Sequence, residues 1–259
     1  MVRSVLKELG YDLVKSAPAQ PAKDEPPLRN REIKYPLGSW YQIPDSSLYT
    51  PFFSPWLGEG EFKHYYAFAA PRSLVSIDRC YVLYTLLMQS LLIPGDVWEC
   101  GVYKGGTAAM MAALLRDKMP SKKLYLFDTF EGMPATDSAK DVHKKGDFAD
   151  TSTEGIMTHI GCPDICEVRP GFIPSTFAGL ESAQIAFAHV DVDIYQSVLD
   201  SLNFIWPRLS RGGFIIADDY GWPSCPGARA AVEEFFVGKS AIPLCLVSGQ
   251  ALIFKGAAW

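Results

Sequence analysis

The chain has 259 residues, 48% of them apolar and 20% charged, which suffices for a substantial core in one large domain or one domain with an appendage. This composition excludes disordered, collagen-like and coiled-coil chains, and no apolar run reaches the roughly 18–20 residues of a membrane span. With 24 basic and 29 acidic side chains, the net charge of −5 argues against nucleic acid as a partner. No signal-peptide pattern opens the chain, so we expect a cytoplasmic protein.

The N-terminal quarter predicts an appendage to a larger body. Residues 1–15 suit a short helix, and residues 16–36 contain five prolines, which is typical of a linker or a surface arm. Residues 37–70 concentrate aromatic side chains, which disordered linkers do not. This segment either packs onto the body or forms a lid over a site, and a homo-oligomer interface is a further alternative. We therefore divide the chain into an N-terminal arm or lid (1–70) and a body (71–259).

From residue 71, segments of strand length alternate with segments of helical periodicity. Strands are predicted at Asp96–Cys100, Lys123–Asp128, Cys166–Arg169, Gln184–Asp191 and Gly213–Asp218. Helices are predicted at Gly106–Lys118, Thr151–Ile160 (opening with a capping box at Thr151), Ile194–Trp206 and Ala228–Val237. The last two segments, Ala241–Leu246 and Ala251–Phe254, suit an antiparallel hairpin at a sheet edge. The pattern predicts an α/β fold with a doubly wound, mostly parallel sheet, in which ligands bind beyond the carboxyl ends of the strands.

The first of these strand ends leads into a glycine-rich turn. Gly101, Gly105 and Gly106 allow a tight turn into a helix and the close approach of a ligand, although a purely structural turn is the alternative. Their spacing differs from the dinucleotide-binding fingerprint. Glu99, just before them, suits an amino group far better than a phosphate.

The second strand ends on Asp128, where an acidic residue can accept hydrogen bonds from both hydroxyls of a ribose. The alternative is that Asp128 caps a turn. Taken with Glu99, Asp128 indicates a nucleoside that carries an amino acid, and S-adenosylmethionine (SAM) fits that description.

Four carboxylates follow two further apolar strands, Asp191 and Asp193 after one and Asp218 and Asp219 after the other. Grouped at neutral pH they would repel each other, and a cation would relieve the repulsion. Oxygen ligands favour a hard ion, Mg²⁺ first, with Mn²⁺ or Ca²⁺ as alternatives. Capping of helices is the alternative role of these aspartates. No zinc site is expected, because the six cysteines and four histidines show no ligand spacing.

These residues lie in stretches that resemble the macrocin O-methyltransferase (TylF-type) family. The resembling stretches are GVYKGG (101–106), DTFEGMP (128–134), GFIPSTF (171–177), HVDVDIYQS (189–197) and LSRGGFIIADDYGWPSC (209–225). The resemblance spans roughly residues 71–237 and implies a Rossmann-like class I SAM-dependent methyltransferase domain. It implies a seven-stranded sheet with an antiparallel C-terminal edge strand, to which this chain adds its aromatic-rich N-terminal extension.

The resemblance also implies roles for individual residues. SAM would contact Glu99, Gly101, Tyr103, Gly105, Gly106 and Thr107, with Asp128 on its ribose and Phe130, Phe172 and Ile173 near its adenine. Mg²⁺ would be held by Asp191, Asp218 and Asp219, and Asp193 would act as general base.

The expected activity is methyl transfer to a sugar hydroxyl, free or in a glycoside, glycan or natural product, with vicinal hydroxyls chelating the metal. A catechol-type methyltransferase of aromatic diols is the first alternative, although Ile194 stands where those enzymes carry a lysine. A nicotinamide-dependent oxidoreductase and an inactive SAM-fold binding module are further alternatives. The missing dinucleotide fingerprint disfavours the former, and the retained aspartates disfavour the latter.

Overall fold

The computed structural model describes residues 32–34, 40–42 and 54–256, which belong to two compact units. In the first unit, β1 (Glu32–Lys34) pairs antiparallel with β2 (Trp40–Gln42). The helix predicted in residues 1–15 lies outside the described residues. No helix in the described ranges is both long enough and apolar enough to cross a membrane.

The second unit is built on a seven-stranded sheet of order β5-β4-β3-β6-β7-β9-β8. Its strands are β3 (Asp96–Cys100), β4 (Leu124–Asp128), β5 (Cys166–Pro170), β6 (Ile185–Val190), β7 (Leu209–Ala217), β8 (Leu244–Cys245) and β9 (Ala251–Phe254). The pairs among β3 to β7 are parallel, whereas β9 runs antiparallel to both β7 and β8. The predicted doubly wound sheet with a C-terminal hairpin at its edge is confirmed.

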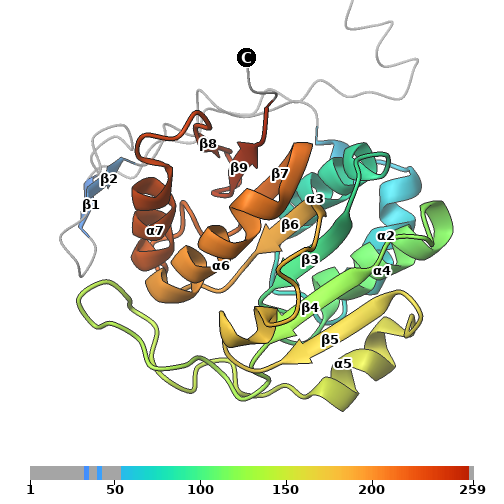
Figure 1. Cartoon of the computed structure of the whole chain (residues 1–259), viewed down its shortest axis with the longest axis horizontal. Coiled ribbons are helices and arrows are strands. Elements are labelled where there is room, and N and C mark those ends of the chain that lie inside the picture. Colours follow the sequence, from blue (N-terminus) through green and yellow to red (C-terminus); the bar gives the residue numbers. More distant parts are fainter. Residues whose placement is uncertain (1–31, 35–39, 43–53, 257–259) are drawn as a thin grey trace, which may run out of the picture. The chain divides into compact units, whose positions relative to one another are not determined.

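Helices cover both faces of this sheet (Figure 1). The helical segments are η2 (Pro55–Leu57), α2 (Glu61–Ala69), α3 (Ile77–Ser90), α4 (Gly106–Lys118), α5 (Thr153–Ile160), η3 (Ser175–Phe177), α6 (Tyr195–Arg208) and α7 (Pro226–Phe236). Helices α2 to α5 share one core with one face of the sheet, and η3, α6 and α7 share a second core with the other. Helix α4 is buried all round from Gly106 to Leu115, and residues 108–115 are a run of alanine, methionine and leucine, which favour a helix.

Several predicted boundaries differ from the observed ones, and two of these differences have a clear structural cause. Strand β7 begins at Leu209 rather than Gly213, because Gly212 and Gly213 continue the pairing through hydrogen bonds with Lys255 instead of breaking it. Helix α5 is capped by Ser152 rather than Thr151, since the Ser152 hydroxyl accepts a hydrogen bond from the Gly155 amide.

The described part of the aromatic segment that belongs to the second unit, residues 54–70, packs onto that unit. Phe62 and Tyr65 of α2 are buried in the same core as α3 and α4, and the Phe62 ring meets Tyr81 of α3 edge-on at 5.1 Å between centroids. Here the packing interpretation accounts for the aromatic side chains. The aromatics of residues 43–53 lie outside the described residues.

The strand order reverses between β3 and β6. From β3 the chain crosses to β4 through α4 on one face, and from β6 it crosses to β7 through α6 on the other. Loops at the carboxyl ends of β3 and β6 therefore diverge and leave a crevice, the usual ligand position in such sheets.

Candidate active site

A cavity of about 380 Å³ lies at this crevice, within the usual size of a small-molecule site. Ten of the predicted site residues line it, namely Gly101, Tyr103, Gly106, Thr107, Asp128, Phe172, Ile173, Asp191, Asp193 and Asp219. The other four, Glu99, Gly105, Phe130 and Asp218, are not among its lining residues. None of the described residues 54–70 lines it.

The glycine-rich turn after β3 is held tightly against its surroundings. Gly101 has φ +88°, and a β-carbon there would lie 1.7 Å from the carbonyl oxygen of Asp191. Gly105, with φ +79°, caps α4, and a β-carbon on Gly106 would lie 2.5 Å from the backbone nitrogen of Ser73. The fold itself requires glycine in this turn. The alternative that the glycines serve a purely structural turn therefore holds whether or not a ligand binds.

Asp128 fixes the shape of the same turn. Its Oδ2 accepts hydrogen bonds from the amides of Val102 and Tyr103, both at 2.8 Å, and its Oδ1 accepts one from the Phe130 amide at 2.8 Å. Asp128 therefore caps the turn, as the alternative interpretation held, and it also faces the cavity. Its contact with a ribose stays a prediction.

Glu99 lies beneath the cavity, inside β3, rather than in the loop. Its Oε1 pairs with His189 Nδ1 of β6 at 2.9 Å, and both side chains are fully buried. Glu99 Oε2 has no hydrogen-bond partner among the described residues. Burial alone would lower the pKa of His189, but hydrogen bonds with Asp218 and Glu99 outweigh it and raise that pKa well above its usual value. A contact between Glu99 and a cofactor stays a prediction.

Asp218 is the most heavily partnered of the four aspartates. Its Oδ2 pairs with the Arg79 guanidinium of α3, and its Oδ1 contacts Gln250 Nε2 at 2.7 Å and His189 Nε2 at 3.3 Å. Burial opposes ionisation, yet His189, Arg79 and Gln250 together lower the pKa of Asp218 below its usual value. Asp218 is therefore a buried carboxylate that is already compensated by positive charge.

The remaining three aspartates are not compensated in this way. Burial and the neighbouring Asp218 raise the pKa of Asp219 to about 6, and burial with Asp218 and Asp219 raises that of Asp191 well above its usual value. Strand β6 ends at Val190, and Asp193 adopts φ +55°, so Asp191 and Asp193 both line the cavity despite their alternate positions. Asp219 is buried and Asp191 and Asp193 are partly buried, and a group of oxygen donors that repel each other is the donor set that a hard divalent cation prefers.

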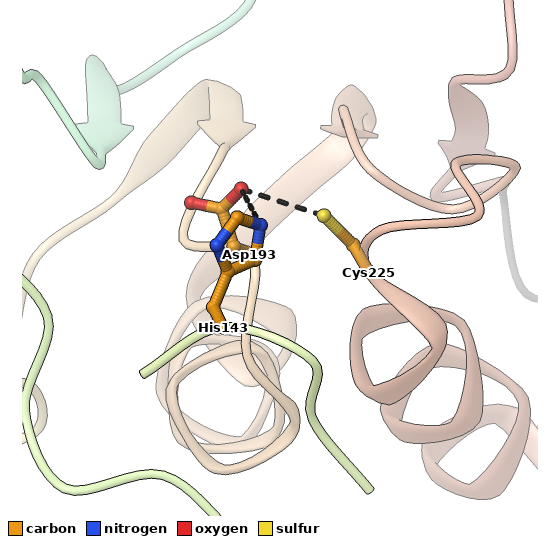
Figure 2. A group of neighbouring side chains, drawn as sticks. All are labelled: His143, Asp193 and Cys225. Carbon is orange, nitrogen blue, oxygen red and sulfur yellow. Dashed lines mark hydrogen bonds and ion pairs between the residues drawn. The ribbon is translucent and has the colours of Figure 1, made fainter. Parts of the chain in front are cut away.

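Asp193 also contacts two residues that no sequence pattern had linked to it (Figure 2). Its Oδ1 lies 3.4 Å from Cys225 Sγ, at the start of α7, and 3.7 Å from His143 Nε2, in the loop between β4 and α5. The other ring nitrogen, His143 Nδ1, lies 3.2 Å from Asp147 Oδ2.

The sequence analysis missed Arg79, His143, His189 and Cys225. A signal was available for His189, since it is the single titratable side chain in the otherwise apolar strand β6. Arg79, His143 and Cys225 reach the site from elements far apart in the chain, and no local pattern marks them.

The family model for macrocin O-methyltransferase (TylF) matches residues 83–247 of the chain. The chain is 32% identical over 155 residues to the 8-demethyl-8-(2,3-dimethoxy-alpha-L-rhamnosyl)-tetracenomycin-C 4'-O-methyltransferase of Streptomyces olivaceus. It is 30% identical over 155 residues to the demethyldecarbamoylnovobiocin O-methyltransferase of Streptomyces niveus. Each alignment covers 55% of this chain and spans only 58% of the length of that relative.

Solved structures share the fold. The O-methyltransferase NovP superposes with a TM-score of 0.64 at 23% identity, covering 71% of this chain and 82% of NovP. Calicheamicin methyltransferase superposes with a TM-score of 0.60 at 21% identity, covering 80% of this chain and 95% of that one. These likenesses establish the class I methyltransferase fold.

Proposed function

Because the chain belongs to the macrocin O-methyltransferase family, we propose that it is a SAM- and Mg²⁺-dependent enzyme that methylates a sugar hydroxyl of a natural product. The relatives named above act on a rhamnosyl tetracenomycin and on a novobiocin precursor, which supports a glycosylated acceptor over a simple aromatic diol.

One observation carries the proposal: a single cavity combines the glycine-rich turn with three uncompensated aspartates. The turn, Asp128 and the apolar residues Phe172 and Ile173 form a wall on which an adenosyl group can lie. Asp191, Asp193 and Asp219 line the same space, so a methyl donor and a metal-chelating diol can meet there.

The aspartates fit a divalent cation. Asp191 and Asp219 carry raised pKa values because buried like charges face each other there, and a cation would remove that cost. We assign Asp191, Asp218 and Asp219 as the residues that would hold it. Arg79 and His189 fix Asp218 in place beneath the cavity.

When bound, SAM supplies the methyl group and Mg²⁺ lowers the pKa of an alkyl hydroxyl. Asp193 is then the general base, since it lines the cavity but is not needed to hold the metal. Its position is fixed, because its amide donates to Asp219 Oδ2 at 3.2 Å and its carboxylate accepts from Cys225. The Asp193 carboxylate would accept the proton of the acceptor hydroxyl.

Methyl transfer from isotopically labelled SAM to a panel of rhamnosides and noviosides, with Mg²⁺ or with a chelator, tests the proposal. We expect transfer to a vicinal-diol sugar that stops when the metal is removed. Asp193→Asn should lower kcat by about 10²–10⁴-fold while leaving the affinity for S-adenosylhomocysteine unchanged. Failure to bind S-adenosylhomocysteine, or transfer that persists without metal, would contradict the proposal.

A further inference from the structure

We propose that His143, Asp193 and Cys225 form a second metal site, distinct from the aspartate site, that binds Zn²⁺ and inhibits the enzyme. The three ligand atoms, His143 Nε2, Asp193 Oδ1 and Cys225 Sγ, all lie within 4.8 Å of one another. They come from three separate elements, and the two dashed contacts in Figure 2 converge on one oxygen of Asp193.

Two of the three distances between the ligand atoms fall in the range of tetrahedral zinc, and the third is no longer than 4.8 Å. Bonds of about 2.0–2.3 Å to nitrogen, oxygen and sulfur place the ligand atoms of a zinc ion roughly 3.3–3.8 Å apart. Here Asp193 Oδ1 lies 3.4 Å from the sulfur and 3.7 Å from the imidazole nitrogen. Three protein ligands at the wall of the cavity leave the fourth position open, the arrangement of zinc sites that accept an exchangeable ligand.

The surroundings of His143 provide a second, independent observation. Metal-binding histidines usually donate their other ring N–H to a carboxylate, which sets the tautomer. Asp147 occupies that position, with its Oδ2 3.2 Å from His143 Nδ1 and 3.0 Å from the Lys144 amide. With Nδ1 facing Asp147, Nε2 is the ring nitrogen that points towards Asp193.

The loop that carries His143 is anchored rather than free. Asp141, two residues earlier, is buried, and its Oδ1 accepts a hydrogen bond from the Tyr195 amide at the start of α6 at 2.8 Å. Cys225 is likewise buried at the start of α7. All three ligands are therefore held by the fold before a metal arrives.

The ligand types separate this site from the magnesium site. Thiolate and imidazole favour zinc and related transition metals, whereas the carboxylates Asp191, Asp218 and Asp219 favour Mg²⁺. The two sets share no residue, and the thiol and imidazole of the second site are poor ligands for Mg²⁺. On binding, a Zn–S bond forms at Cys225 and the thiol proton leaves to solvent.

Inhibition follows from Asp193, and this part rests on the proposed function. An Asp193 oxygen that is coordinated to zinc cannot accept the proton of the acceptor hydroxyl. Zinc therefore blocks methyl transfer without displacing SAM or Mg²⁺.

The test is a titration of the full chain with Co²⁺, a spectroscopic substitute for zinc, in excess Mg²⁺. We expect a thiolate-to-cobalt charge-transfer band that saturates at one equivalent and is bleached by Zn²⁺. Cobalt at the aspartate site gives no such band, because that site has no sulfur. No band in the wild type, or a band that survives Cys225→Ser, overturns the proposal.

Matched variants refine the test. The band should persist in Cys245→Ser, which removes an exposed thiol of β8, and Asp147→Asn should weaken cobalt binding by roughly 10–100-fold. His143→Gln should weaken it further, and an unchanged affinity in this variant would exclude His143 as a ligand. Because these readouts are spectroscopic, they hold even if no acceptor for methyl transfer is found, which separates this proposal from the proposed function.

Discussion

The carbonyl oxygen of Asp191 lies 1.7 Å from the position that a β-carbon on Gly101 would occupy. The end of β6 thus presses against the turn that follows β3, so the aspartate that we propose as a metal ligand and the turn that we propose for the cofactor share one backbone contact. A side chain at position 101 would disturb both at once.

We therefore expect Gly101→Ala to destabilise the protein strongly. The control is Gly146→Ala, since Gly146 has φ +90°, close to the +88° of Gly101, but nothing lies within 4 Å of its β-carbon position. The control should lose about 1–2 kcal/mol in free energy of unfolding, which is the cost of the left-handed conformation alone, and Gly101→Ala should lose clearly more. Thermal unfolding of the two variants measures the difference, and equal losses would mean that the close contact does not matter.

Arg79 is expected to be the most important cation of the fold. Replacing it with leucine leaves Asp218 buried without its guanidinium partner, which should cost about 3–5 kcal/mol in free energy of unfolding. The surface pair of Arg116 and Asp117 supplies the control, and Arg116→Leu should cost no more than about 1 kcal/mol. Urea unfolding compares the two variants. A loss for Arg79→Leu as small as that of the control would show that His189 and Gln250 suffice to compensate the charge of Asp218 without Arg79.

Asp141 should stabilise the start of α6. Asp141→Ala removes the acceptor of the Tyr195 amide, and an unsatisfied buried donor costs about 1–3 kcal/mol. Asp141→Asn keeps an oxygen acceptor and should recover most of this loss. Denaturant unfolding followed by circular dichroism tests the pair, with hydrogen exchange at Tyr195 as the local readout. An asparagine variant as unstable as the alanine variant would mean that the negative charge of Asp141, rather than its hydrogen-bond acceptor, stabilises the start of α6.

Stability without metal should fall as pH rises from about 4 to about 6. The pKa of Asp219 is raised from 3.8 to about 6, so the folded state holds a proton in this window that the unfolded state has lost. Deprotonation then costs the folded protein stability, and Mg²⁺ should restore it. We expect Mg²⁺ to raise Tm more at pH 7 than at pH 5, with a smaller pH dependence in Asp219→Asn. A shift in Tm that is independent of pH would argue against metal binding at Asp219.

Much of the fold was predictable because strand and helix periods are local. The runs Asp96–Cys100 and Gly106–Lys118 fall within the bounds that their apolar pattern predicts. Asp191 and Asp218 could be singled out for the same reason, since each directly follows an apolar strand and the carboxyl ends of parallel strands meet; Asp219 is the next residue after Asp218.

The rest of the site depends on contacts that no local pattern encodes. Glu99 appeared as a loop carboxylate, but its place in β3 directs it to His189 beneath the cavity. His143 and Cys225 have no ligand spacing in sequence. The loop between β4 and α5 brings His143 to Asp193, and the start of α7 brings Cys225 there. Asp128 shows a third case, because the sequence offered a cap or a ribose contact and only the structure reveals the cap.

The balance of charge at the cavity and just behind it determines which ions the cavity admits. Apart from Asp193, which we assign as the general base, the carboxylates are Glu99, Asp191, Asp218 and Asp219. They are accompanied by two cations, Arg79 and His189, so when all are ionised this group lacks two positive charges. A monovalent ion leaves part of that deficit, and a trivalent ion exceeds it. We therefore expect the charge of an ion, more than its radius, to decide whether it binds in the cavity. Potassium should not bind there despite its abundance in cells.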